Sequence, residues 1–538
     1  MTETPVAKRF VSDRVAVAVL LTAMAVVVTL HVVALVTDGQ MLWLAQWIDL
    51  PAAVLVLVSL LIGMVLPMPA VVRRTLARLS ETRHIYLFAA FVAFAVLAVG
   101  TVVVLGVTPI SADEEAPLFQ ARLFAEFRII AQYPAGMLDA VIPRVDQQVF
   151  IVVSPDGRAM SAYFPGWALL MTPFVWLGVP WLLGPAMGAT AVYMIGRLAE
   201  LLTNSKAAVI ALILTLASGS FLLTGMSLYP AGGFLTLSLV YAWFLIRGGT
   251  RDYFLAGLVG GLALNLNNPI PHAVFALPWL LWLLLDPARR RRIVPLAIGY
   301  LPGLIVIAAW VFLQSSLATP EIASSGGLWT SKLPLLAAIP SIHSIGLRFL
   351  DLLTAWSWSS PGLLVLAAVG WWQTRDNIAL RLLGASFAST VLLYTLYPTD
   401  QGLGYGARYF NVAWGVLPIL AAAALWSPER YPLRRFVLTA ALAGLILVVP
   451  LQLLVGHSQD DRRAAPMQAL SGPGVDLYFV DFTEGGVAET VLANDLSHGT
   501  EIVLVSQGPA IDQSIVDRWF PGARLVTHNL HGSGYARP

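Results

Sequence analysis

The sequence predicts an α-helical polytopic membrane protein of about thirteen transmembrane helices, followed by a small C-terminal α/β domain outside the membrane. Three observations support this prediction. The 538 residues are 58% hydrophobic and only 12% charged, which is more apolar surface than soluble cores bury. Apolar runs of spanning length recur throughout residues 1–456. In residues 457–538 the apolar runs shorten to the length of β-strands.

The predicted spans are apolar runs separated by short polar or cationic segments. The run from Val15 to Val36 is long enough to cross a bilayer, and no small-residue cleavage site follows it cleanly. We therefore expect it to be the first span rather than a cleaved signal peptide. All predicted spans are centred near residues 26, 59, 97, 185, 217, 238, 261, 278, 303, 364, 388, 417 and 446.

The lysine and arginine residues predict the orientation of these spans. If the N-terminus is cytoplasmic, 20 of the 32 cationic residues fall in the short cytoplasmic segments. The other cationic residues are spread over much longer segments, so the positive-inside rule selects this orientation. The predicted outer segments are residues 109–166, 314–350 and 457–538.

Composition and motifs exclude several functional classes. The net charge of +2 comes with scattered cationic residues, so we expect no nucleic-acid partner. The absence of cysteine excludes disulfides, thiolate nucleophiles and cysteine metal sites. No HExxH motif, Walker loop, dinucleotide fingerprint or serine elbow occurs, so nothing in the sequence indicates a metalloprotease, ATPase, dehydrogenase or hydrolase.

The C-terminal residues predict a small α/β domain. Three short apolar runs predict strands at residues 475–482, 501–508 and 523–530. A helix is expected between the last two, near residues 510–520, and Pro521 and Gly522 would end it.

The first outer segment begins with three consecutive acids, Asp113, Glu114 and Glu115. One interpretation is a helix start, because Ser111 and Glu114 have capping-box spacing and acids complement the helix dipole. Such a helix would lie along the membrane surface with four apolar residues on one face: Phe119, Leu123, Phe127 and Ile130. The other interpretation is catalytic, because a rigid helix end is a good mount for a base. The two do not exclude each other.

Three features together resemble the GT-C superfamily of polyprenyl-phosphate-sugar-dependent glycosyltransferases. They are the acidic residues after the third span, the segment AYFPGWALLMTPFVWLG at 162–178, and GYGARYFNVAWGVLPIL at 404–420 with its Gly-x-Arg-Tyr motif. The likeness is greatest to the bacterial aminoarabinose transferase and protein O-mannosyltransferase branch, and it covers nearly the whole helical part. Each motif is short, so the specificity comes from order, side and spacing together. About thirteen spans and a small external C-terminal domain are also what this GT-C resemblance implies.

The resemblance implies an inverting glycosyltransferase on the extracytoplasmic face of the bacterial inner membrane. Its donor would be a sugar linked to polyprenyl phosphate, and its acceptor a hydroxyl of a glycan, lipid or protein. Asp113 would be the general base that takes the acceptor proton. Glu114 or Glu115 would orient the acceptor or hold a cation, and Asp113 and Glu114 are the candidate ligands of a divalent metal cation.

The departing polyprenyl phosphate needs a positive charge nearby, and Arg408 in the Gly-x-Arg-Tyr motif is the leading candidate. Alternatively, Arg408 has no role at the donor phosphate, and its side chain only extends to the lipid headgroups. The segment NNPIPHAV at 267–274 has no Arg-Pro element of the kind usual in the family. Asn267, Asn268 and His272 stand there as candidate donors to sugar or phosphate, although a polar turn needs such residues anyway. Arg348, before a tryptophan-rich span start, is a further candidate cation.

Tyr163 in the first outer segment is a candidate residue for shaping the acceptor site, although nothing in its spacing singles it out. Trp167 is a candidate for binding the acceptor or the sugar, because aromatic rings stack on sugar faces. Interfacial belts, however, account for most tryptophan in polytopic proteins.

A transporter or flippase of lipid-linked or small substrates is the main alternative function. Transporters keep ionisable residues near the membrane midplane, whereas the predicted span centres hold almost none, with His31 the exception. A scaffold that binds lipid without activity is a third possibility.

Overall fold

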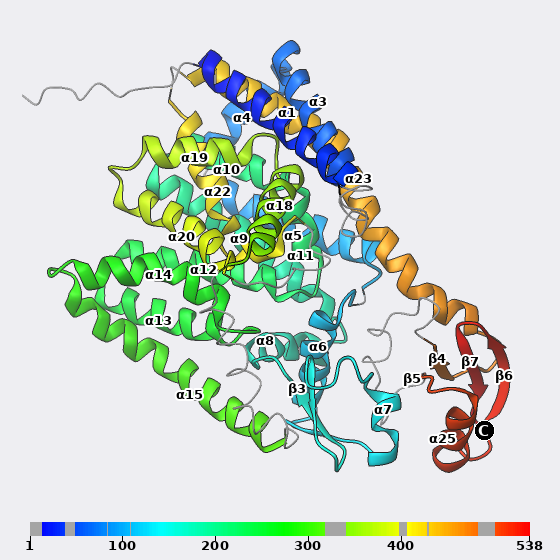
Figure 1. The fold of residues 1–538 in the computed structure, drawn as a ribbon. Helices are drawn as coiled ribbons and strands as arrows, with labels where there is room; N and C mark the ends of the chain where they lie inside the picture. The colour runs from blue at the N-terminus through cyan, green and yellow to red at the C-terminus, as the bar shows by residue number, and fades with distance from the viewer. Residues whose placement is uncertain are drawn as a thin grey trace, which may run out of the picture.

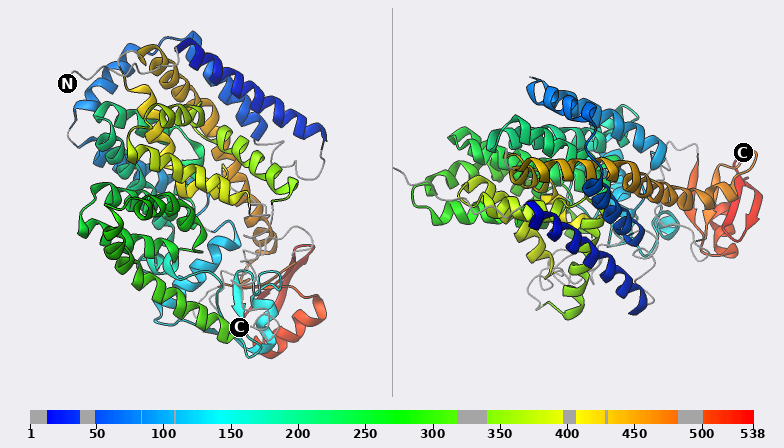
Figure 2. Two further views of the ribbon diagram at one scale, coloured as in Figure 1. Left: turned by 60° about the vertical axis from the view of Figure 1, so that its left-hand side comes forward. Right: turned by 90° about the horizontal axis from the view of Figure 1, so that it is seen from above.

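The computed structural model describes residues 13–37, 49–82, 84–107, 109–317, 340–396, 406–427, 430–481 and 501–538. The described chain is mostly helical, with two small sheets lying together beyond one end of the helices (Figure 1). We call that end of the molecule the sheet end. Figure 2 shows from two further directions that the C-terminal strands project there.

The helices of the N-terminal half are α1 (Asp13–Thr37), α3 (Leu50–Val65), α4 (Ala70–Glu81), α5 (Ile85–Val104), α6 (Ala112–Ala125), α7 (Leu138–Val141), α8 (Gly166–Trp176), α9 (Leu183–Leu202), α10 (Ser205–Leu216), α11 (Gly219–Met226), α12 (Pro230–Arg247) and α13 (Thr250–Leu264). Those of the C-terminal half are α14 (Ile270–Leu285), α15 (Ile293–Leu317), α18 (Ile342–Trp358), α19 (Leu363–Gln373), α20 (Ile378–Tyr394), α21 (Asn411–Trp414), α22 (Val416–Leu425), α23 (Tyr431–Leu470) and α25 (Pro509–Trp519).

Many of these helices have the length and the apolar composition of membrane spans. Among the described residues, six helices are long and apolar enough to cross a bilayer, or up to ten if each of four bent pairs forms one span. In α5, only 28% of the apolar window is buried inside the protein, so most of its side chains face lipid. The predicted centres lie in or directly beside described helices; Ala217, for example, lies between α10 and α11. The count of thirteen spans stays a prediction.

Small residues bring some helices into direct backbone contact. A Cβ on Gly257 of α13 would lie 2.1 Å from the carbonyl oxygen of Leu296 in α15, and one on Gly299 would lie 2.2 Å from the carbonyl oxygen of Phe254. In lipid, where apolar side chains gain little by meeting one another, such close approach is a main source of helix association. The α13–α15 pair is therefore fixed by its glycines.

The first small sheet belongs to the outer segment predicted at 109–166. It contains the antiparallel strands β1 (Ala131–Gln132), β3 (Arg158–Ser161) and β2 (Ile151–Val153), in that order. Of the other outer segment predicted at 314–350, residues 318–339 lie outside the described residues.

The second sheet lies in the C-terminal part. Its order is β5 (Ile502–Val505), β4 (Leu477–Val480), β7 (Gly532–Ala536) and β6 (Arg524–Asn529), with β4 and β5 parallel and the other pairs antiparallel. Each of the three predicted strand segments contains one of these strands, and α25 occupies the predicted helix. The strand β7 has no counterpart among the predicted strands. The boundary predicted at 457 stays a prediction, and α23 continues through it to Leu470.

The predicted surface helix of the first outer segment is shorter than expected. Phe119 and Leu123 of α6 are buried in a cluster with Leu477 and Ile502 of the second sheet. Phe127 lies beyond the end of α6 and is 89% exposed. The apolar face of α6 therefore packs on protein, and the prediction that it lies along the membrane through Phe127 and Ile130 was wrong.

Candidate active site

Asp113 lies in the first turn of α6, which follows the long apolar helix α5. Ser111 before it has the extended backbone of an N-cap, but its side chain makes no capping hydrogen bond. The side chain of Glu114 instead accepts a hydrogen bond from the backbone N–H of Ile110, at 2.9 Å. The predicted capping box is therefore not formed, because Ser111 makes no cap and the Glu114 side chain accepts from Ile110 instead of Ser111. The acidic turn still complements the positive end of the helix dipole.

Three side chains from distant segments donate to the Asp113 carboxylate. The hydroxyl groups of Tyr163 and Tyr229 each donate a hydrogen bond to it, one to each oxygen. The Nη1 of Arg408 lies 3.0 Å from the oxygen that Tyr229 also contacts. Because the side chains of Asp113 and Arg408 are only about a fifth exposed, solvent screens this ion pair less than one on the surface.

Backbone conformation explains how Arg408 reaches this position. Gly406 and Ala407 both have a positive φ, of 79° and 63°, and together they turn the chain into the short helical turn that starts at Arg408. A Cβ on Gly406 would lie 2.6 Å from the Cβ of Ser220 and 2.7 Å from the Cβ of Trp358. The glycine of the Gly-x-Arg-Tyr motif is thus required both for its left-handed conformation and for its close packing.

The guanidinium of Arg408 is also held by aromatic rings. Its Cζ lies 4.8 Å from the centroid of the Tyr229 ring and 5.8 Å from that of Tyr409. Tyr409 in turn stacks on Tyr394 at a centroid distance of 4.8 Å. Among the described residues, nothing accepts a hydrogen bond from the buried Nε of Arg408. Arg408 therefore retains donor capacity for a ligand.

These residues line a cavity of about 170 Å³. Its wall combines the acid and the arginine with four tyrosines, two asparagines and several apolar residues: Asp113, Tyr163, Tyr229, Pro230, Ala231, Phe234, Asn267, Asn268, Ile270, Pro271, Tyr394, Arg408, Tyr409 and Val412. Such a wall suits a ligand that carries hydroxyl groups and a negative charge.

Five of the predicted site residues line this cavity, namely Asp113, Tyr163, Asn267, Asn268 and Arg408. The others lie outside its wall. Glu114 and Glu115 are 1% and 2% exposed. Trp167 is fully buried, and its indole donates to the carbonyl oxygen of Leu228 at 2.7 Å.

His272 and Arg348 have their own buried partners. The Nε2 of His272 lies 2.7 Å from the hydroxyl of Tyr300. Arg348 pairs with Asp351 at 3.1 Å, and its Cζ lies 5.1 Å from the centroid of the Tyr409 ring. Arg348 therefore contacts Tyr409, which lines the cavity, but does not line the cavity itself.

A divalent cation at Asp113 and Glu114 stays a prediction. Within the described ranges, no group of three or more histidine, aspartate or glutamate side chains is placed to hold a metal ion. Asp113 already faces the positive charge of Arg408, and Glu114 is engaged with the backbone of Ile110.

Tyr229 and Tyr394 line the cavity but were not predicted as site residues, and Tyr409 was given no role. Asn267, predicted with Asn268 and His272 as a candidate donor, does line the cavity. Tyr409 stands inside the Gly-x-Arg-Tyr motif, which was the available signal. Tyr229 directly precedes Pro230, the first residue of α12, so its position at a span start was readable, but its contact with Asp113 was not.

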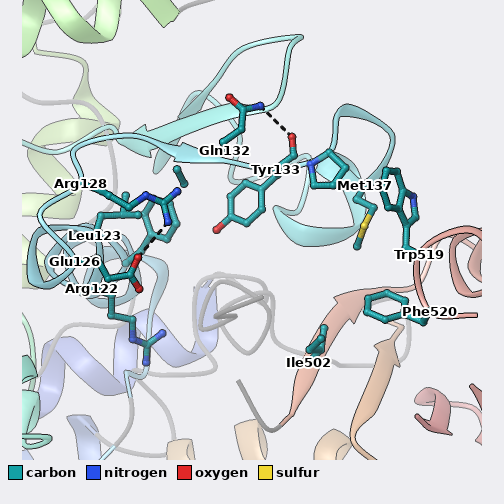
Figure 3. A pocket seen from close by; sticks show the side chains of 13 residues that line it. Arg122, Leu123, Glu126, Arg128, Gln132, Tyr133, Met137, Ile502, Trp519 and Phe520 are labelled. Carbon is teal, nitrogen blue, oxygen red and sulfur yellow. Dashed lines mark hydrogen bonds and ion pairs between the residues drawn. The ribbon is translucent and has the colours of Figure 1, made fainter. Parts of the chain in front are cut away.

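A second cavity, of about 250 Å³, lies between α6, the loop around β1 and the C-terminal part (Figure 3). Arginines and aromatic rings dominate its wall, which consists of Phe119, Arg122, Leu123, Glu126, Arg128, Ala131, Gln132, Tyr133, Pro134, Met137, Ile502, Trp519 and Phe520. We call it the outer cavity.

The fold and the site together define a polytopic helical protein with a polar, tyrosine-rich cavity at its sheet end. Its fold is similar to that of ArnT from Cupriavidus metallidurans. The structure of ArnT bound to undecaprenyl phosphate aligns with a TM-score of 0.55 at 12% identity, over 84% of this chain and 98% of ArnT. The apo structure of ArnT aligns over the same shares with a TM-score of 0.53 and 12% identity. The predicted GT-C-like resemblance is thus confirmed at the level of fold. The sequence matches no protein-family model and no curated protein.

Proposed function

We propose that this protein is an inverting glycosyltransferase that moves a sugar from a polyprenyl-phosphate-linked donor to an acceptor hydroxyl, with Asp113 as the general base. The observation that carries this proposal is the pairing of Asp113 with Arg408 inside a polar cavity. The fold adds support, because a solved structure of similar fold, that of ArnT, contains undecaprenyl phosphate. The proposed location is the bacterial inner membrane, with the sheet end in the periplasm.

Arg408 is the proposed partner of the donor phosphate. Its Nε lacks an acceptor among the described residues, and buried donors are normally satisfied. A phosphate oxygen would provide that acceptor in the geometry that guanidinium groups favour. The positive charge would also stabilise the negative charge that develops on the phosphate as the sugar leaves.

Binding of the donor phosphate would also free Asp113 to act as the general base. A second anion beside Arg408 would compete for its guanidinium and free one carboxylate oxygen of Asp113 for the acceptor hydroxyl. In the proposed step the acceptor oxygen bonds to the anomeric carbon while the bond from that carbon to the phosphate oxygen breaks. The acceptor proton goes to Asp113, and the polyprenyl phosphate leaves with the bonding electrons. Attack opposite to the leaving group inverts the anomeric configuration.

The tyrosines would position these groups. Hydrogen bonds from Tyr163 and Tyr229 fix the orientation of the carboxylate, and the ring of Tyr229 supports the guanidinium. A base held in one orientation needs little rearrangement in the transition state. Asn267 and Asn268 on the same wall offer amide donors and acceptors for sugar hydroxyl groups.

We assign acceptor binding to the outer cavity. Arg122 and Asp113 both belong to α6, and nine residues of helix rise about 14 Å, roughly the length of a few sugar units. Trp519 and Phe520 offer rings for stacking, and Arg122 and Arg128 offer donors. A glycan-bearing acceptor would fit this chemistry.

Turnover of purified full-length protein with a panel of polyprenyl-phosphate sugars tests the proposal. Free polyprenyl phosphate would be measured with and without EDTA, for wild type and Asp113→Asn. We expect Asp113→Asn to abolish release while donor binding is retained. Asp139→Asn, an acid at the same end that pairs with Arg144, is the matched control and should retain activity.

Full release by Asp113→Asn would exclude Asp113 as the base. If no donor binds to well-folded protein, the transporter, flippase or scaffold functions become the better explanation.

A further inference from the structure

A third cavity lies at the end of the helical domain opposite Asp113, between α4, α10 and the start of α23. Its volume is about 260 Å³. Helix α5 begins beside this end and leads to α6, and its 20 residues rise about 30 Å. This opposite cavity is therefore separated from the Asp113 cavity by about the thickness of a membrane core.

Cationic side chains converge on the opposite cavity from three segments of the chain. Its wall contains Arg73, Lys206, Arg434 and Arg435, against a single acid, Glu81. The wall therefore has an excess of positive charge.

The arginines share one neighbour on the wall. Arg73, Arg434 and Arg435 all lie near enough to the hydroxyl of Tyr431 to act on it electrostatically. The Cζ of Arg434 lies 5.4 Å from the centroid of the Tyr431 ring. Like charges gathered around one group repel each other, and an anion among them would relieve this repulsion.

The remainder of the wall is apolar. Met68, Val209, Ile210, Ile213 and Leu438 form it, and Val209 and Ile210 are themselves buried within the protein. Helix α4 is bent by 88° from α3, so if α3 crosses the bilayer, α4 runs along the membrane surface. The cavity thus offers cations at the membrane surface and apolar side chains beside them.

We propose that the opposite cavity binds the headgroup of an anionic phospholipid. The phosphate would lie among the arginines and Lys206, and the first part of the acyl chains would cover the apolar wall. Basic pockets between membrane helices bind anionic lipid headgroups in this way. An inorganic anion would use the cations but leave the apolar wall in water, so the combined chemistry favours a lipid. The site is independent of the sugar-transfer function.

Native mass spectrometry of the purified full chain tests this site, with dioleoyl phosphatidylglycerol as the probe. Dioleoyl phosphatidylcholine and inorganic phosphate are the comparison ligands. We expect phosphatidylglycerol to bind and neither comparison ligand to displace it at equal concentration. Since each cation near a lipid surface contributes about fivefold in affinity, the double variant R73Q/K206Q should bind roughly 25-fold more weakly.

The double variant R251Q/R291Q is the matched control, because it removes two exposed arginines near the same end but outside the opposite cavity. It should retain phosphatidylglycerol binding within about twofold. Equal losses in the two double variants would overturn the proposal, and so would displacement of the lipid by inorganic phosphate. If R73Q/K206Q folds poorly, Arg435→Gln alone should still weaken binding about fivefold.

Discussion

The guanidinium of Arg408 lies 3.0 Å from the carboxylate of Asp113, although 295 positions separate the two residues in the chain. The same carboxylate receives the hydroxyl groups of Tyr163 and Tyr229. Four segments of the helical domain are thus joined at one charged group. A change at any of the four residues should therefore act on the others.

Arg408→Gln should weaken the binding of polyprenyl phosphate by about ten- to a hundredfold, because it removes charge-assisted hydrogen bonds to the phosphate. Quenching of tryptophan fluorescence during a lipid titration would measure this. Arg144→Gln removes an exposed cation near the same end, paired with Asp139, and should leave the affinity unchanged. An unaltered affinity for Arg408→Gln would exclude it as the phosphate ligand.

Tyr229→Phe and Tyr163→Phe should each lower kcat by about tenfold while changing donor affinity little. Each substitution keeps the aromatic ring and removes one hydrogen bond to the carboxylate, which contributes roughly 1.5 kcal/mol. Steady-state kinetics would separate kcat from KM. Tyr193→Phe in α9 is the control. If the two variants raise only KM, the hydroxyl groups bind substrate rather than orient Asp113.

Most of the helices could be predicted from the sequence, because an apolar run of spanning length is rarely compatible with any structure other than a transmembrane helix. The acidic turn at Asp113 and the Gly-x-Arg-Tyr motif were also readable as short local patterns. The contact between Asp113 and Tyr229 was not predictable, because the two residues are 116 positions apart in the chain and only helix packing brings them together.

Other differences between the predicted and the observed elements have local causes. Phe127 continued the apolar spacing of α6, but the chain takes a positive φ there and leaves the helix. The strand β7 has the sequence Gly-Ser-Gly-Tyr-Ala, which lacks the β-branched residues that mark strands. Its place in the middle of the sheet is fixed by pairing with β4 and β6.

Trp519→Ala should raise the acceptor KM by about three- to tenfold, as expected for losing one aromatic stacking contact. Donor binding should be unchanged, because the outer cavity is separate from the wall around Arg408. Trp372→Ala, a tryptophan 55% exposed on α19, is the matched control. Equal effects of the two variants on KM would exclude the outer cavity as the acceptor site.

Gly257→Ala should destabilise the helical domain by about 1–3 kcal/mol, the usual effect of overpacking. The added Cβ would lie 2.1 Å from a backbone oxygen of α15, and a backbone cannot move as a side chain can. Thermal unfolding in detergent would measure the change. Gly346→Ala in α18 is the control, since a Cβ there meets nothing within 4 Å, and it should stabilise slightly. Equal unfolding temperatures for both variants would contradict the close packing of α13 and α15.

Asp512 should make the stability of the C-terminal sheet depend on pH. Its buried carboxylate accepts hydrogen bonds from the Ser506 hydroxyl at 2.6 Å and the Gln507 backbone N–H at 2.8 Å. Burial is the larger effect and raises the pKa of Asp512 above its ordinary value. The folded state therefore binds this proton more tightly than the unfolded state. Its contribution to stability is complete below the unfolded pKa, about 3.9, and is lost as the pH rises through the folded pKa.

Asp512→Asn removes this titration, so it should flatten the decline of stability with pH in residues 501–538. Amide hydrogen exchange of peptides from this region in the full-length protein would measure the effect. Comparing variant and wild type at each pH cancels the intrinsic pH dependence of exchange. Asp517→Asn, on the exposed side of the same helix, should follow the wild type. Parallel curves for wild type and Asp512→Asn would mean that Asp512 has the same pKa folded and unfolded, because only a difference in proton binding between the two states links stability to pH.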